Sequence, residues 1–168
     1  NDAFRELRLN HGLDFSKSTF TTVTYRSLYA IMCTDADGNA CPIILPKTVT
    51  SLGDQAFWGQ NGSGKQVIVF LGDKPTSISS NALDTNNQGI NTLVVDAETY
   101  PAWTETNFIP VEEIPEAEVT ELIQRLSKIP NFPGNLSKVL GKSTFGTAEK
   151  YANWVVQLAR PATMIIIK

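Results

Sequence analysis

The sequence is poor in the residues that carry most enzyme chemistry. Its 168 residues include one histidine, His11, and two cysteines, Cys33 and Cys41. A Ser-His-Asp triad would have to use His11, which lies in a turn-like Asn-His-Gly segment, and the sequence contains no Gly-x-Ser-x-Gly motif. A zinc site built on the two cysteines would have its histidine far away in sequence. We therefore predict no catalytic residues, no metal ligands and no cofactor.

An excess of charge of one sign and long apolar runs are missing as well. The net charge is −3 with 18% charged residues, which excludes a global basic field that would recruit nucleic acid or an anionic membrane. No apolar run approaches the roughly 18 residues that a membrane-spanning helix needs. The 42% hydrophobic content instead indicates a folded protein. Its length is that of a single domain over residues 1–168.

The first two-thirds of the chain are patterned for β-structure. Apolar and polar residues alternate over 19–33, which predicts a long strand with one wet face. Residues 35–39 (DADGN) predict a turn that makes a hairpin with the apolar strand after it. Continuous apolar runs at 66–72 and 91–96 predict buried strands. No internal repeat is evident, and we predict a mainly antiparallel sheet within a β-rich region, 1–110.

The last third, 112–160, is patterned for helices. Apolar residues recur at i, i+3, i+4 and i+7 between acidic residues at the start and basic residues at the end, which predicts a helix over 115–129. A second helix is predicted over 147–160, and a terminal strand over 162–168. The predicted fold is α+β, with both helices packed on the sheet. The helix residues expected to be buried are Val119, Leu122, Ile123, Leu126, Trp154, Val155 and Leu158.

A glycine-rich stretch, Gly59–Gln66 (GQNGSGKQ), resembles the Walker A loop of ABC-type ATPases over about seven residues, with Gly59, Gly64 and Lys65 in the matching places. Gln66 stands where that loop has a magnesium-binding serine or threonine. The stretch also leads into an apolar strand, whereas the loop needs a helix whose free N–H groups hold the phosphates. We therefore predict an exposed turn before a strand at 67–71, with no bound nucleotide.

The two cysteines stand symmetrically about Asp37, in the middle of the predicted hairpin turn. Cys33 and Cys41 would therefore face each other across the two strands. Two interpretations remain open: a disulfide, for which such a distance is suitable, or a pair of partly buried reduced thiols.

Carboxylates at the predicted strand ends give one catalytic hypothesis. Asp73 follows the apolar run at 66–72, and Asp96 and Glu98 follow the run at 91–96. Such groups can bind magnesium for phosphodiester hydrolysis. The competing interpretation is that they begin solvated loops, and no histidine base lies nearby in sequence.

A second hypothesis is single-stranded nucleic-acid binding, in which bases stack on aromatic rings beside a local basic groove. It requires the candidate residues to cluster at the surface, whereas aromatic residues also commonly fill the core. The candidates are Tyr25, Arg26, Tyr29, Lys47, Phe57, Trp58 and Lys65.

The leading hypothesis is a non-enzymatic structural or interaction protein, a subunit of a larger assembly that acts through protein contacts or self-assembly. The well-patterned chain offers no coherent catalytic set. Prolines at strand ends and long loops rich in Ser, Thr and Asn suit a subunit that docks through its loops and sheet edges.

Overall fold

The computed structural model describes residues 4–58, 66–83, 91–105, 108–129, 132, 134–144 and 153–159. The protein is a β-rich α+β protein. Its strands are β1 (Arg8–Leu9), β2 (Leu13–Asp14), β3 (Thr22–Val23), β4 (Met32–Cys33), β5 (Pro42–Leu45), β6 (Ser51–Leu52), β7 (Val67–Phe70), β8 (Ser77–Ile78), β9 (Thr92–Asp96), β10 (Phe108–Pro110), β11 (Asn135–Ser143) and β12 (Asn153–Ala159). Its helices are α1 (Pro101–Thr104), the 3-10 helix η1 (Val111–Glu113) and α2 (Glu116–Ser127).

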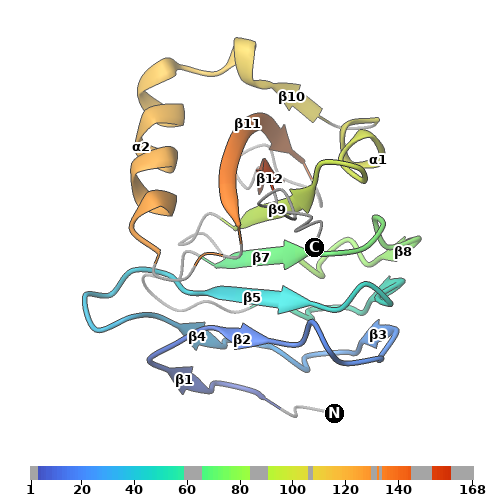
Figure 1. Cartoon of the computed structure of the whole chain (residues 1–168). Coiled ribbons are helices and arrows are strands. Elements are labelled where there is room, and N and C mark those ends of the chain that lie inside the picture. Colours follow the sequence, from blue (N-terminus) through green and yellow to red (C-terminus); the bar gives the residue numbers. More distant parts are fainter. Residues whose placement is uncertain are drawn as a thin grey trace, which may run out of the picture.

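The central feature is a stack of coils. Each coil is one circuit of the chain, and its strands pair in parallel with the strands of the coil before it. β2, β5, β7 and β9 pair side by side in parallel, and Figure 1 shows these strands stacked from the N-terminal end upward. Ile43, Ile68 and Leu93 are partners in adjacent strands. They stand about 25 residues apart, a period typical of repeat architectures in which each unit contacts its neighbours.

Each of the first three coils has a second strand, of two residues. β3, β6 and β8 form a separate parallel sheet, in which Val23 pairs with Leu52 and Leu52 with Ile78. The turns that follow also stack, because the N–H groups of Phe4, Leu28 and Phe57 each donate to a carbonyl oxygen in the next coil. The internal repeat that the sequence did not reveal is therefore present in the structure.

The central strands of the large sheet, β5, β7, β9 and β12, are buried on both faces over most of their length. Ile68 and Phe70 of β7 belong to the core between the two sheets, whereas Val67 and Val69 belong to a second core beneath α2. Side chains alternate between the two faces of a strand, so a strand covered on both sides is a continuous apolar run. The run Val67–Phe70 was correctly predicted as a buried strand.

The C-terminal part extends the same sheet. β12 pairs in parallel with β9, and β11 and β10 then follow in antiparallel order. Gly141 of β11 has a φ of +153°, and a side chain there would meet the carbonyl oxygen of Ile109 at 2.1 Å. This close approach requires glycine, because any Cβ would push β10 away from β11.

The prediction of a mainly antiparallel sheet is wrong. Every pairing among the strands of the coil stack is parallel, and antiparallel pairs occur between β10, β11 and β12 and at a bridge between Thr34 and Ala40. The predicted long strand over 19–33 is also wrong, because turns occupy 25–30 between β3 and β4. The bridge confirms the predicted turn around Asp37, but the apolar strand after it, β5, pairs in parallel with β2 and β7 and so does not form the predicted hairpin. The strands of the coil stack pair with the strand one coil away and not with the next strand along the chain.

The two predicted helices have different outcomes. Helix 115–129 is confirmed as α2, which packs on the outer face of the sheet and is joined to it by an ion pair between Glu118 and Lys142. Helix 147–160 is wrong where it can be judged, because 153–159 is the strand β12. The prediction of two C-terminal helices on the sheet therefore fails. Residues 147–152 and the predicted strand 162–168 lie outside the described residues.

Burial agrees with most of the predicted core positions. Leu122, Leu126, Trp154, Val155 and Leu158 are buried, and Val119 is half-buried. Ile123 is wrong: 43% of its surface is exposed. The apolar stripe of α2 is therefore narrower than the sequence pattern indicates.

Candidate functional site

Aromatic and arginine side chains gather on the turns of the coil stack. The Cζ atom of Arg26 lies 5.0 Å from the ring centre of Tyr25 and 5.1 Å from that of Tyr29. The Tyr29 ring in turn contacts the Trp58 ring, with 5.5 Å between ring centres. The Cζ atom of Arg5 lies 5.4 Å from the centre of the Tyr29 ring. These five residues are called the turn cluster below.

The stacking of the coils brings the turn cluster together. Arg26 and Gln55 occupy equivalent places in successive turns, and the Arg26 Nε donates to the Gln55 Oε1 over 2.6 Å. The Arg26 backbone N–H also donates to the Asp54 carbonyl. Both Arg26 and Gln55 have positive φ, 52° and 54°. Because the strained backbone recurs from coil to coil, it belongs to the repeated turn and not to Arg26 alone.

The structure brings together some of the predicted nucleic-acid candidates and separates others. Tyr25, Arg26, Tyr29 and Trp58 lie in the turn cluster, with Tyr25 46% exposed. Phe57, in contrast, is fully buried in the core.

Two further candidates do not join the turn cluster. Lys47 lines a different hollow, described below. Lys65 lies outside the described residues. Arg5 is a member that sequence reasoning missed, because no local pattern connects it to Tyr29. The signal that would have found it is the repeat itself, which places the N-terminal residues beside the next turn.

The carboxylates at the strand ends do converge. Asp73, Asp96 and Glu98 line one hollow of about 310 Å³, together with Lys47. Asp73 follows β7 and Asp96 ends β9, and the carboxyl ends of neighbouring parallel strands lie at the same edge of a sheet. However, no group of three or more histidine, cysteine or acidic side chains in the described part of the chain is arranged to hold a metal ion. The predicted carboxylates therefore line one hollow, but the described residues there do not form a set of magnesium ligands.

His11 lies closer to a cysteine than the sequence indicates. It lines a hollow of about 350 Å³ with Cys41, Asp14 and Asp35, because the coil register places His11 one coil before Cys41. Both carboxylates already accept hydrogen bonds: Asp14 from the Ser16 backbone N–H, and Asp35 from the backbone and side chain of Asn39. Hydrogen bonds from the Ser16 side chain and backbone lower the pKa of the Asp14 carboxyl group, and those from the Asn39 side chain and backbone lower the pKa of Asp35. The hollow is thus lined by acceptors that are already engaged.

The cysteines face each other across the turn around Asp37 as two free thiols. The backbone N–H of Cys41 donates to the carbonyl oxygen of Cys33 over 2.7 Å. Burial raises the pKa of Cys33 to about 12, with a further contribution from Cys41, and burial also raises the pKa of Cys41. Because the thiolate is the nucleophile and metal ligand, both groups are held in their unreactive form.

We therefore expect Cys33 to resist alkylation in the folded protein. At pH 8 a thiol with this raised pKa is ionised to only about one part in ten thousand, against about one in four for a free thiol. Iodoacetamide should label Cys33 at least about 100-fold more slowly in buffer than in urea, as followed by mass spectrometry of the peptides. Equal rates in the two solvents would contradict the buried, protonated thiol. A protein that stays unlabelled even in urea would show a disulfide.

The Walker-like stretch is described only at its last residue. Gly59 to Lys65 lie outside the described residues, so the predicted exposed turn and the absence of nucleotide stay predictions. Gln66 is buried, and its Nε2 donates to the carbonyl oxygen of Ile31. The strand β7 follows at once at Val67–Phe70, which confirms the strand predicted over 67–71 except for its last residue. Gln66 thus acts as a structural link between coils.

Among the described helices, none combines the length and the apolar character that crossing a bilayer requires. Comparison with known proteins gives no relative from which a function could be transferred: no protein-family model, no curated protein and no solved structure matches this chain.

Proposed function

We propose that this protein is a non-enzymatic interaction module, a subunit of a larger assembly, and that the turn cluster is its main contact with a protein partner. The observation that carries the proposal is the position of Arg26 between the rings of Tyr25 and Tyr29, at the surface of the stacked turns. Tyrosine, tryptophan and arginine are the residues that most often dominate binding energy in protein interfaces.

The architecture supports the same function. Stacked coils present extended surfaces that repeat proteins commonly use for binding. The turn cluster is also held in place before any partner arrives, since Arg26 is bonded to Gln55 and Tyr29 contacts both Arg5 and Trp58. Side chains that are already ordered lose less conformational entropy on binding.

The chemistry of the remaining polar groups favours a binding role over a catalytic one. The two thiols are held protonated by burial. His11 is exposed, and its Nδ1 contacts the side-chain oxygen of the adjacent Asn10. Neither arrangement activates a nucleophile, which would need a base within hydrogen-bond distance or a lowered pKa.

We expect Arg26→Ala to weaken partner binding by about 30-fold or more, as truncation of a central arginine or aromatic anchor typically costs 2 kcal/mol or more. The wild type and Arg26→Ala would be used as paired baits in an extract of the native source. The protein enriched by the wild type would then be purified and titrated against both baits by calorimetry.

The matched control is Glu121→Ala on the exposed side of α2, away from the turns. It should bind as the wild type does. A partner that binds all three proteins equally would place the interface elsewhere. The absence of any saturable partner, together with a strictly monomeric protein in light scattering, would contradict the proposal.

Single-stranded nucleic acid is the second candidate partner, because the turn cluster combines two arginines with three aromatic rings. The net charge of −3 works against it, as do the burial of Phe57 and the separate location of Lys47. An oligonucleotide column distinguishes the two candidates: nucleic-acid binding would give retention that falls steeply with salt and is lost in Arg26→Ala.

A further inference from the structure

We propose that the protein binds a buried water molecule where the coil stack meets β12, and that the side-chain amides of Gln66, Asn91 and Asn153 hold it. The water donates a hydrogen bond to two of the amides and accepts one from the third, and so joins three strands of the large sheet. This inference is independent of the proposed partner binding, because it concerns the interior of the molecule and not the turn cluster.

The three amides hold one register position on the adjacent strands β7, β9 and β12. The residues that follow Gln66 and Asn153 both pair with Thr92, which is the residue that follows Asn91. The N–H groups of Thr92 and Trp154 donate to the carbonyl oxygens of Gln66 and Asn91, so the ladder extends to the amide residues themselves. Because neighbouring strands lie about 4.8 Å apart, Asn91 stands between the other two amides.

All three side chains are directed into the closed interior of the molecule. Residues two positions apart on a strand face the same side, and the residues two positions after each amide belong to the core between the seven-stranded and the three-stranded sheets: Ile68, Leu93 and Val155. The exposed fraction is 5% for Gln66, 0% for Asn91 and 1% for Asn153. Bulk solvent does not reach the amides, and each of their polar atoms therefore needs a partner in the interior.

The hydrogen bonds of the amides are incomplete in a complementary way. The Gln66 Nε2 donates to the carbonyl oxygen of Ile31 over 3.4 Å, and the Asn91 Nδ2 donates to that of Leu83 over 2.8 Å. The Gln66 Oε1, the Asn91 Oδ1 and the Asn153 Nδ2 are buried and have no hydrogen-bond partner among the described residues. A buried donor or acceptor without a partner is costly. Two acceptors and one donor thus remain to be satisfied on three neighbouring strands.

A single water molecule matches these three atoms. Its two O–H groups can donate to the amide oxygens of Gln66 and Asn91, and its oxygen can accept from the Asn153 Nδ2. Buried waters typically make about three hydrogen bonds to polar groups that lack other partners. A cation fits this set less well, because the Asn153 Nδ2 presents hydrogens, and an anion fits less well because of the two amide oxygens. The balance of donors and acceptors therefore favours water.

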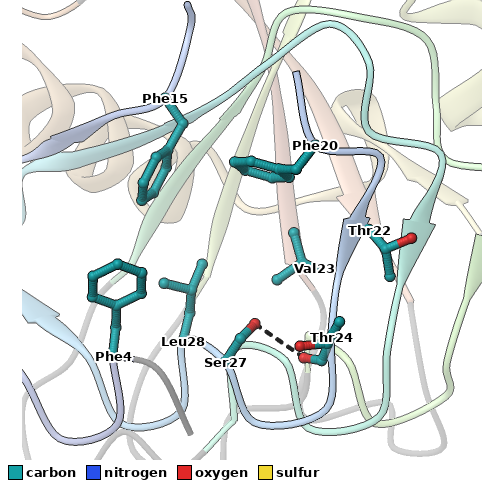
Figure 2. Close-up of a pocket in the computed structure, with 8 residues that line it drawn as sticks. All are labelled: Phe4, Phe15, Phe20, Thr22, Val23, Thr24, Ser27 and Leu28. Atoms are coloured by element: carbon teal, nitrogen blue, oxygen red, sulfur yellow. Dashed lines mark hydrogen bonds between the residues drawn. The ribbon is translucent and has the colours of Figure 1, made fainter. Parts of the chain in front are cut away.

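An apolar pocket in the first coils has the opposite chemistry. It has a volume of about 140 Å³, and Figure 2 shows the apolar side chains around it: Phe4, Phe15, Phe20, Val23 and Leu28. The hydroxyl group of Ser27, which also lines the pocket, already donates to the carbonyl oxygen of Thr24. Apolar walls offer a water few hydrogen bonds. A long-lived water is therefore expected at the three amides and not in this pocket.

A double-mutant cycle tests whether one bound group couples strands that are not neighbours. Gln66 and Asn153 lie on β7 and β12, which β9 separates, and distant residues with no shared partner usually affect stability independently. Gln66→Leu and Asn153→Leu should each raise the unfolding equilibrium constant. In the double variant the increase should be smaller than the product of the single effects by about 3-fold or more, because both substitutions remove bonds to the same water.

The matched control for this cycle combines Gln66→Leu with Ser137→Ala. Ser137 is exposed near the start of β11 and donates to the carbonyl oxygen of Gln157. The effects of these two substitutions should multiply. If the effects of Gln66→Leu and Asn153→Leu also multiply, no shared water joins the two amides and the proposal is overturned.

Measurements on the wild type need no variant to fold. Cross-relaxation by NMR should transfer magnetisation from a long-lived water to the side-chain amide protons of Asn153, and the rotating-frame experiment separates this transfer from proton exchange by its sign. In a crystal structure, an ordered water oxygen should lie within about 3.2 Å of the Gln66 Oε1, the Asn91 Oδ1 and the Asn153 Nδ2. The absence of either signal would overturn the proposal, as would a direct hydrogen bond between the amides of Asn91 and Asn153.

Discussion

Phe57→Ala should lower the free energy of unfolding by about 3–5 kcal/mol, the usual cost of truncating a fully buried phenylalanine. The Phe57 side chain is completely enclosed in the core between the seven-stranded and the three-stranded sheets. Its backbone N–H is bonded to Ala82 in the next coil, so the surrounding coils cannot move far to fill the space. Urea unfolding followed by circular dichroism measures the change.

Phe4→Ala is the control for this prediction, because Phe4 and Phe57 share one position in the repeat. Phe4 is 40% exposed, and its truncation should cost about 1 kcal/mol or less, within the range of partly exposed sites. Equal losses for the two substitutions would mean that the coils do not stack in the register described. A small loss at Phe57 would mean that the core between the sheets is not closely packed.

Leu122→Asp should lower the free energy of unfolding by about 3 kcal/mol or more, because it places an unpaired carboxylate in an apolar core. Leu122 is 3% exposed and packs in the core that α2 shares with the outer face of the sheet. Thermal unfolding at neutral pH should show the loss as a lowered Tm, and lowering the pH should restore part of it by protonating the new carboxylate.

Ile123→Asp makes the same chemical change one residue further along α2. Ile123 is 43% exposed, so the new carboxylate remains hydrated, and we expect a loss of no more than about 1 kcal/mol. Both variants introduce aspartate into the same helix, and their difference therefore reports mainly burial. If Ile123→Asp proved the more harmful, the helix would be rotated about its axis from the orientation in the structure.

Local sequence patterns correctly predicted the elements that depend on residues close together in the chain. α2 has apolar residues at helical spacing and charges suited to its ends, and it was found within a few residues of its predicted bounds. The apolar runs that became β7 and β9 were found because strands covered on both faces contain few polar residues. The turn around Asp37 followed from its turn residues.

The pairing of the strands could not be predicted in the same way. A short apolar run has the same appearance whether its neighbour is parallel or antiparallel, and here the neighbour lies about 25 residues away. The repeat escaped notice because few of its positions carry a constant residue type. Thr22, Ser51 and Ser77 agree in polarity, and Val23, Leu52 and Ile78 in apolar character, but their spacing along the chain varies. Residues 153–159 were predicted as part of a helix because their apolar residues recur at helical spacing. In the structure they form the strand β12, because pairing with β9 outweighs that local pattern.

In the candidate site, too, residue types could be predicted from the sequence, whereas contacts between distant segments could not. Residue types alone identified Tyr25, Arg26, Tyr29 and Trp58 as surface candidates that could act together. Phe57 has the same chemical character and is buried, because it lies one residue from Trp58 on the inner side of the turn. Arg5 joined the cluster from a segment that the local pattern had no means to connect.

The stacking of coils has a consequence for how the molecule opens. In a one-dimensional stack, stability is approximately the sum of each unit and its contacts with its neighbours, so coils that are joined by the shortest ladders separate most readily. The first coil joins the rest through the two-residue strands β2 and β3, whereas the longer ladders of β7, β9 and β12 bind the opposite end. Opening should therefore begin where β2 and β3 pair with β5 and β6, so that the amide hydrogens of these short ladders exchange while the longer ladders persist.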